Sequence, residues 1–267
     1  MTDVTLFLDS ITDAGPDAVG RIAVAGSHGG LYAAAVASRA GLRAVVLNDA
    51  GRGLNDAGIA GVRALENVGM AGCAVDCQSA EIGSARDAAE NGVISFANSV
   101  AEGLGVVPGM TTASALERLH GAPAPRGMLD AVPEARWDET LGGLAVLCVD
   151  SASLIKPEDA GRVIVTGSHG GLIGGDPARA CKAAARLAVF NDAGGGKGGI
   201  GFTRLPALDQ RGVGAVTLDC GSCEIGSAAS GLEGGVISAV NDTAAAMGLH
   251  KGQRLKDALA RLGASGS

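Results

Sequence analysis

The second half of this chain repeats the first. In a sequence of 267 residues, Asp9 to Arg118 return block by block as Asp150 to Arg261. The matching blocks are RIAVAGSHGGL with RVIVTGSHGGL, LNDAG with FNDAG, DCQSAEIGSA with DCGSCEIGSA, and ENGVISFAN with EGGVISAVN. These blocks are polar and rich in glycine, whereas a purely structural repeat would match in its core. The duplication therefore predicts two similar halves and marks the loops in which a functional site is expected.

A linker is expected between the halves. The duplication divides the chain into a first repeat (1–122), a linker (123–141) and a second repeat (142–267), and each repeat is long enough to bury a core. The linker has no counterpart in the repeat and contains three prolines and the only tryptophan, Trp137. Such proline density is typical of a connecting segment. We expect Trp137 to pack at the junction.

Hydrophobic patterning predicts an α/β fold. Short runs of Val, Ile and Leu alternate with longer Ala- and Leu-rich segments of helical spacing, which is typical of crossover units around a parallel sheet. The predicted class is two pseudo-symmetric α/β repeats, each a mainly parallel sheet flanked by helices. The first repeat is expected to hold strands at 4–8, 21–25, 44–47 and 73–76, and helices at 33–40, 58–68, 93–104 and 112–119. The second follows at a shift of 141 and then 143 residues, with an altered helix start at Asp176-Pro177.

Charge and composition exclude two classes of partner. The net charge is -7 and no run of Lys or Arg occurs, so we expect no nucleic-acid partner. The sequence shows neither an apolar stretch of about 18 residues nor a leader-like N-terminus, so we expect no membrane partner and a cytoplasmic location. The six cysteines are expected to be reduced. Because the Cys220-x-x-Cys223 pair is not shared by the first repeat, we expect no redox or zinc role for it.

The GSHGG loop carries the strongest functional signal. It follows a predicted strand in each repeat, and ligands of parallel sheets bind at the carboxyl ends of the strands. Glycines let the backbone approach a ligand and leave amide groups free to hold an oxyanion. Neighbouring serine and histidine side chains diverge, so we expect the serine of one repeat to bond to the histidine of the other. The alternative is a turn in which serine caps a helix and histidine bonds the backbone. The residues concerned are Ser27, His28, Gly29 and Gly30, with Ser168, His169, Gly170 and Gly171.

The NDAG loop places an amide and a carboxylate beside the first loop. The pairs are Asn48-Asp49 and Asn191-Asp192. The carboxylate is suited to orienting a histidine, holding an ammonium group or acting as a general base. The same four letters also make a plain turn, and both interpretations stay open.

The third loop brings a thiol, a hydroxyl and carboxylates to the same rim. Two equivalent cysteines in pseudo-symmetric halves form a layout similar to that of cofactor-independent amino-acid racemases. The cysteine motifs of the aspartate/glutamate racemases are absent, and an aspartate beside each thiol raises its pKa. The residues are Asp76, Cys77, Ser79 and Glu81, repeated as Asp219, Cys220, Ser222 and Glu224.

Three weaker patterns remain. Asn98 and Asn241, with Ser95 and Ser238, are expected to satisfy amides at the start of a helix. A G-x-G-x-x-G match at Gly194, Gly196 and Gly199 occurs in the second repeat only, where Lys197 replaces Leu54. A metal held by both histidines and any of Asp49, Asp192, Glu81 or Glu224 is an alternative that no ligand spacing supports, and our prediction includes neither a metal nor a cofactor.

The leading hypothesis is an enzyme that hydrolyses or opens the ring of an amide, imide or lactone in a cleft between the repeats. Ser27 or Ser168 is the expected nucleophile or water-positioning group, His28 or His169 the general base with Asp49 or Asp192 nearby, and glycine amides the oxyanion donors. The alternatives are a racemase that uses Cys77 and Cys220, and a non-catalytic protein that binds a small acid or a nucleotide. A sheet edge that has no partner strand can pair with another copy of the chain, so a homo-oligomer remains an alternative. The expected substrate-binding residues are Gly29, Gly30, Gly170, Gly171, Asn48, Asn191, Ser79, Glu81, Ser222, Glu224 and Lys197.

Overall fold

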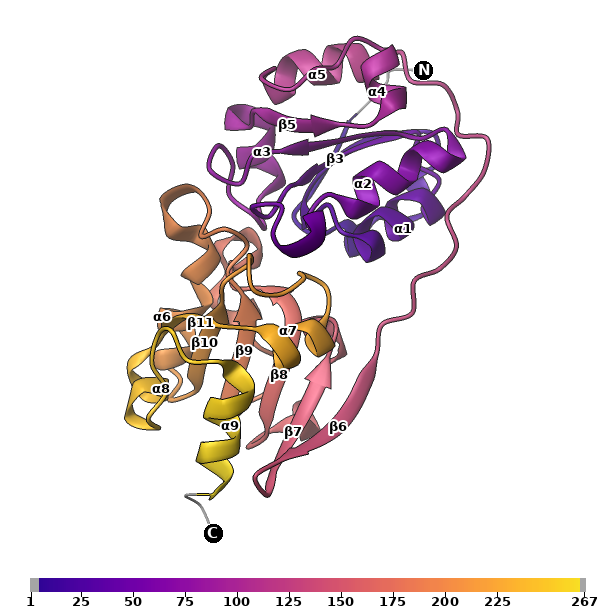
Figure 1. The fold of residues 1–267 in the computed structure, drawn as a ribbon. Helices are drawn as coiled ribbons and strands as arrows, with labels where there is room; N and C mark the ends of the chain where they lie inside the picture. The colour runs from indigo at the N-terminus through magenta and orange to yellow at the C-terminus, as the bar shows by residue number, and fades with distance from the viewer. Residues whose placement is uncertain (1–4, 265–267) are drawn as a thin grey trace.

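The computed structural model describes residues 5–264 as two α/β repeats, each built on one mixed, mostly parallel sheet (Figure 1). The first sheet has the order β1-β2-β3-β4-β5, in which only β5 runs antiparallel to its neighbour. Its strands are β1 (Leu6–Leu8), β2 (Ile22–His28), β3 (Ala44–Asn48), β4 (Ala71–Val75) and β5 (Ile94–Ala97). Its helices are α1 (Leu31–Arg39), α2 (Ala60–Ala64), α3 (Ala85–Asn91), α4 (Ser99–Gly103) and α5 (Thr112–Leu119).

Both faces of the first sheet are covered by helices. Successive residues of a strand point to opposite faces, so Ile22 and Val24 of β2 face one core while Ala23 and Ala25 face the other. Helices α3, α4 and α5 pack on the first face, and α1 and α2 pack on the second. The predicted α/β class with a mainly parallel sheet flanked by helices is confirmed.

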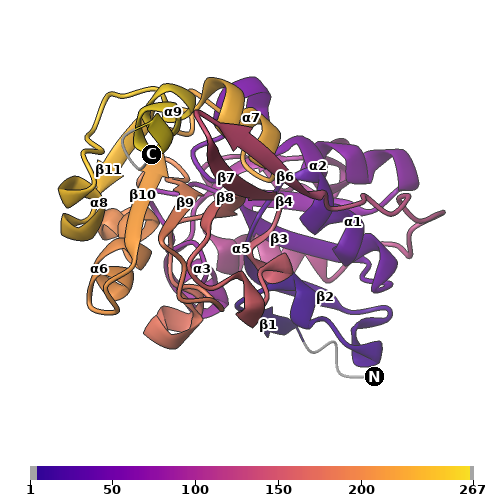
Figure 2. The same cartoon turned by 90° about the horizontal axis from the view of Figure 1, so that it is seen from below.

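The second sheet has the order β11-β10-β9-β8-β7-β6, with antiparallel pairing at both edges. The view in Figure 2 shows this sheet with its helices around it. Its strands are β6 (Arg136–Leu141), β7 (Leu144–Val149), β8 (Val163–His169), β9 (Leu187–Asn191), β10 (Gly214–Leu218) and β11 (Ile237–Val240). Its helices are α6 (Arg204–Asp209), α7 (Ala228–Gly234), α8 (Asp242–Ala246) and α9 (Leu255–Ala264).

The predicted helix at 93–104 is wrong in its first half. Residues Ile94–Ala97 form the edge strand β5, and α4 begins only after Asn98, whose side chain accepts a hydrogen bond from the Ala101 amide. The run Val93-Ile94-Ser95-Phe96 combines β-branched and aromatic residues with an extended backbone, which favours a strand. The same pattern gives β11 in the second repeat. The helix α3, which Ser84 caps, was not predicted.

Helix α1 has no counterpart in the second repeat. After β8 the chain makes two short 3-10 turns, Ile173–Gly175 and Pro177–Arg179, where a helix was expected. Gly174 and Gly175 have φ values of +61° and +68°, which are not helical, and Pro177 has no amide to donate. The repeats therefore differ in the segment that follows the carboxyl end of β8.

The expected linker is an extended connection followed by a strand. Residues 120–135 contain no helix or strand and run along the side of the molecule (Figure 1), whereas 136–141 form β6 at the edge of the second sheet. Trp137 lies on β6 and packs against the core of the second repeat. Its expected place at the junction between the repeats is wrong, because strand pairing with β7 draws it into that core.

The carboxyl-end loops of the two sheets meet at the junction. The Leu54 amide donates to the Cys220 carbonyl oxygen at 2.8 Å, and the Lys197 amide donates to the Cys77 carbonyl oxygen at 2.8 Å. A Cβ atom on Gly51 would lie 2.8 Å from the Cα of Gly194, so only glycine fits there. Ala50, Ile82, Ala193 and Ile225 form a small core between the repeats.

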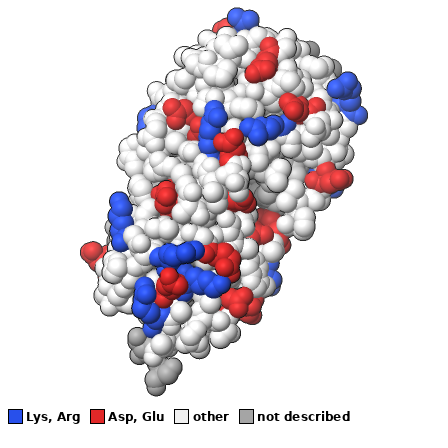
Figure 3. Space-filling model, viewed as in Figure 1, with Lys and Arg blue, Asp and Glu red and all other residues white. Residues whose placement is uncertain are grey.

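The surface bears charges of both signs. On the face shown in Figure 3, acidic and basic side chains are interspersed rather than gathered into one field. Among the described residues, no helix combines the length and apolar character needed to cross a bilayer.

Candidate functional site

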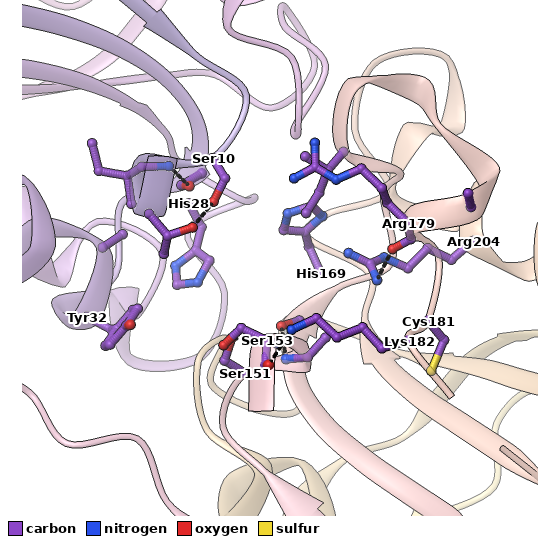
Figure 4. Close-up of a pocket in the computed structure, with 18 residues that line it drawn as sticks. Ser10, His28, Tyr32, Ser151, Ser153, His169, Arg179, Cys181, Lys182 and Arg204 are labelled. Atoms are coloured by element: carbon purple, nitrogen blue, oxygen red, sulfur yellow. Dashed lines mark hydrogen bonds between the residues drawn. The ribbon is translucent and has the colours of Figure 1, made fainter. Parts of the chain in front are cut away.

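A pocket of about 370 Å³ lies between the repeats and is lined by both (Figure 4). Its size is at the lower end of the roughly 300–1,000 Å³ typical of small-molecule sites. Four equivalent pairs of polar residues line it, namely Ser10 with Ser151, Thr12 with Ser153, Ser27 with Ser168, and His28 with His169. The structure thus brings the serine and histidine of both predicted GSHGG loops into one cavity.

His28 stands at the end of β2, and its ring is fixed by the backbone. The Gly30 amide donates a hydrogen bond to Nδ1 at 3.1 Å. In the neutral ring, Nδ1 therefore has no proton and Nε2 carries it. Among the described residues, no hydrogen bond occupies Nε2. Burial lowers the pKa of His28 to about 4, so the ring is neutral at pH 7.

His169 holds the equivalent place at the end of β8. Its side chain is 7% exposed, and its Nδ1 is buried beside Gly171 without the regular hydrogen bond that His28 makes. Burial, followed by electrostatic interaction with the neighbouring Arg204 and His28 side chains, holds the pKa of His169 well below its usual range. Both repeats therefore present a neutral imidazole to the same cavity.

The two loop serines bond to the backbone of their own repeat. The Ser27 Oγ accepts a hydrogen bond from the Ile11 amide at 2.9 Å, and the Ser168 Oγ accepts one from the Ala152 amide at 2.9 Å. The expected serine–histidine bond between repeats does not occur within residues 5–264, because each hydroxyl is held by the turn that follows the first strand of its own repeat. Each hydroxyl keeps its proton for a ligand.

One side of the pocket is cationic. Arg179, Lys182 and Arg204 of the second repeat line it opposite His28 and Tyr32 of the first (Figure 4). No aspartate or glutamate is among the lining residues.

Most of the other repeated polar residues hold the loops themselves. The Asp49 Oδ1 accepts hydrogen bonds from the Gly51 and Cys77 amides, both at 3.0 Å, and Asp192 binds the Gly194 and Cys220 amides equally. Asn48 and Asn191 are 1% and 2% exposed. Each accepts from an amide two residues ahead. None of these four lines the pocket.

The serines of the third loop are also structural. Ser79 donates to the Asp76 carbonyl and accepts from the Val93 amide, and Ser222 does the same with Asp219 and Val236. Two amides of the GSHGG glycines are likewise engaged: Gly29 and Gly170 donate to the carbonyls of Asn48 and Asn191.

The remaining predicted binding residues lie at the junction, outside the pocket. Glu81 leaves its amide bonded to Asp87, Glu224 accepts from the Asn55 side chain at 2.6 Å, and the Lys197 Nζ donates to the Asp87 Oδ1 at 2.7 Å. The last two of these bonds join the repeats.

The thiols are poorly suited to catalysis. Burial, followed by the charges of two neighbouring aspartates, raises the pKa of Cys77 to about 12 and that of Cys220 to about 11. Neither lines the pocket. These findings weigh against a racemase that uses a thiolate. The two cysteines form potential ligand groups with Asp49 and Asp76 and with Asp192 and Asp219, and these groups do not include the histidines.

Two glycines of the G-x-G-x-x-G match, Gly194 and Gly196, stand where a side chain would collide with neighbouring atoms. A Cβ atom on Gly194 would lie 3.1 Å from the Cys77 Sγ, and Gly194, Gly196 and Gly199 all have positive φ. They lead into a 3-10 segment, Lys197–Phe202, rather than directly into a helix. This geometry does not favour a dinucleotide site.

Sequence reasoning missed two groups of lining residues. Ser10 and Thr12 with Ser151 and Ser153 were detectable, because DSIT at Asp9 returns as DSAS at Asp150. Tyr32 and the three cations were not, because they lie where the repeats diverge. Burial and the Glu134 carboxylate raise the pKa of Tyr32 to about 12, so its hydroxyl remains protonated.

No protein-family model, curated protein or solved structure matches this chain. Its function must therefore be inferred from the pocket.

A substitution of Lys197 tests whether this residue stabilises the contact between the repeats or binds the ligand. Its ion pair with Asp87 is partly exposed, with side-chain exposures of 34% and 17%. We expect Lys197→Gln to lower the free energy of unfolding by at most about 1 kcal/mol and to leave ligand affinity unchanged, measured by urea unfolding and calorimetry. A loss of affinity with unchanged stability would return Lys197 to the binding site. Lys251→Gln, at an exposed position, is the matched control.

Proposed function

We propose that this protein is an enzyme that hydrolyses or opens the ring of a small amide, imide or lactone in the pocket between its repeats. The observation that carries the proposal is the pair of neutral imidazoles, His28 and His169, that line one cavity from opposite repeats. Hydrogen-bond donors that are already held in position stabilise the negative charge that develops on a carbonyl oxygen, without cost of reorganisation.

The tautomer of His28 assigns this residue a role that differs from the general base expected from sequence. Because Nδ1 of His28 accepts the Gly30 amide hydrogen, its Nε2 carries a proton and donates to the substrate carbonyl. The serine hydroxyls Ser27 and Ser168 are placed to hold the substrate or the attacking water. In the reaction, the water oxygen bonds to the carbonyl carbon, the ring C–N or C–O bond breaks, and a water proton ends on the leaving atom.

The test is a turnover screen with the whole chain. Small cyclic amides, imides and lactones, each with and without a carboxylate substituent, are incubated with the protein, and ring-opened products are sought by mass spectrometry. We expect a mass gain of one water for at least one ring class, abolished in a His28→Asn/His169→Asn double variant. Thermal stabilisation by these compounds without any product would reject catalysis in favour of a binding protein.

A further inference from the structure

We propose that Arg179, Lys182 and Arg204 form a subsite that binds an anionic oxygen group of the ligand, a carboxylate or a phosphate. This inference deepens the proposed function and rests on it for the identification of the pocket as a substrate site.

Arg204 is a buried cation without a negative partner. Its side chain is only 2% exposed, and its Nε and Nη1 donate to the carbonyl oxygens of Gly171 and Ala180 at 3.0 and 2.6 Å. Its guanidinium also lies 4.9 Å from the ring centroid of Phe190. Within residues 5–264 no carboxylate pairs with it, and burial lowers its pKa to about 10. An uncompensated buried charge costs free energy, which an anionic ligand offsets.

Two further cations face the same space. Lys182 uses one of its donors on the Ser153 carbonyl oxygen at 2.6 Å, which leaves two for a ligand. The Arg179 side chain reaches toward the His169 side of the pocket (Figure 4), and in the described part of the chain it forms no ion pair or hydrogen bond. Both residues are exposed, so a ligand reaches them without a change in fold.

The neighbouring aspartates do not pair with the cationic wall, the side of the pocket formed by Arg179, Lys182 and Arg204. Asp9 and Asp150 precede the lining serines, but each directs a carboxylate oxygen to the first amide of a helix, Ala85 in α3 and Ala228 in α7, both at 3.0 Å. Bonds of this kind stabilise a carboxylate at a helix N-terminus. Within residues 5–264 neither aspartate forms an ion pair with Arg179, Lys182 or Arg204, and no acidic residue is among those that line the pocket.

The wall exists in one repeat only. Arg204 takes the place of Gly61, since the Arg204 amide donates to Gly170 and the Gly61 amide to the equivalent Gly29. A side chain at Gly61 would overlap the Gly30 carbonyl oxygen. Arg179 and Lys182 come from the segment that replaces helix α1. A ligand is thus bound in one orientation across the pseudo-two-fold axis, with its anionic end at the second repeat.

The experiment measures binding by isothermal titration calorimetry, with succinate and inorganic phosphate as anionic probes and neutral succinamide as the control ligand. We expect saturable binding of at least one anion and none of succinamide. Arg179→Gln and Lys182→Gln each remove one exposed cation and are expected to weaken the affinity about tenfold. Arg186→Gln is the matched control, because Arg186 is exposed and precedes β9 at the amino end of the sheet, away from the pocket.

The outcome separates the two ligand sources and the two proposals. Tighter binding of succinate assigns the wall to carboxylates, and tighter binding of phosphate assigns it to phosphates. The inference is overturned if neither anion binds saturably, or if both wall variants bind as the wild type does. Because calorimetry needs no turnover, anion binding combined with a turnover screen that yields no ring-opened product would reject the proposed enzyme and leave the subsite standing.

Discussion

Replacing His28 or His169 with asparagine is expected to lower kcat/KM by about 10²- to 10³-fold, the usual loss when one fixed donor to a developing oxyanion is removed. Asparagine Oδ1 can take the place of Nδ1 and accept the Gly30 amide hydrogen that His28 accepts at 3.1 Å. The loop is therefore preserved while the donor facing the pocket is lost.

Glutamine is the discriminating second variant. Its side-chain amide reaches the position of Nε2 and restores a donor, so His28→Gln is expected to retain more activity than His28→Asn. A general base would show the opposite, since neither amide accepts a proton at pH 7 and both variants would be equally inactive. His250→Asn, at an exposed position outside the pocket, is the matched control and is expected to keep wild-type rates.

The pH profile separates these roles independently. With its pKa lowered to about 4, the His28 ring is neutral from pH 5 to 8, and the pKa of His169 is lowered in the same direction. We expect kcat to show no histidine inflection in this range. An acidic limb near pH 6.5 that disappears in His28→Asn would identify a histidine base with an ordinary pKa instead.

The duplication was a reliable guide to architecture and to one loop. Alternating Val- and Ala-rich segments predicted the α/β class because burial on two faces of a sheet requires that pattern. The self-comparison also predicted that His28 and His169 would meet, because the carboxyl ends of parallel strands lie at one edge of each sheet. It did not predict the helix lost in the second repeat, where Gly174, Gly175 and Pro177 break the pattern.

Recurrence of a polar residue could not separate a ligand role from a structural one. Asp49 and Ser79 recur because tight turns need side-chain acceptors for backbone amides that no sheet partner satisfies. Ser27 and His28 recur for a similar backbone reason and also line the pocket. The two cases differ in where the remaining hydrogen-bonding atoms point, which depends on the three-dimensional structure and not on recurrence.

The cationic wall could not be predicted by comparing the two repeats. Arg179, Lys182 and Arg204 occur where the second repeat departs from the first, so comparison of the halves discards them as noise. In a duplicated protein with a shared pocket, the residues common to both repeats form the loops on its two sides. The residues that differ between the repeats make those two sides chemically different. Arg204 stands where the first repeat has Gly61, so this position gives the two sides of the pocket different charges.

Acidification from pH 6.5 to 4 is expected to destabilise the protein by about 3 kcal/mol through His28 alone. Its pKa falls from 6.5 to about 4 on folding, and each pKa unit corresponds to about 1.36 kcal/mol. In this window the unfolded chain takes up a proton that the folded chain does not. The free energy of unfolding is therefore fully maintained above pH 6.5 and lost as the pH falls toward 4. His169, with its pKa lowered in the same direction, adds to the loss.

Urea unfolding of wild type and of the His28→Asn/His169→Asn double variant at pH 7 and pH 4.5 isolates this contribution. Carboxylates titrate in both proteins, so their effect cancels in the difference. We expect the double variant to lose less stability on acidification than wild type, and His250→Asn to lose as much as wild type. Equal losses in all three proteins would mean that the two imidazoles are solvated and protonate normally. The neutral pair that the proposed oxyanion site requires would then not exist.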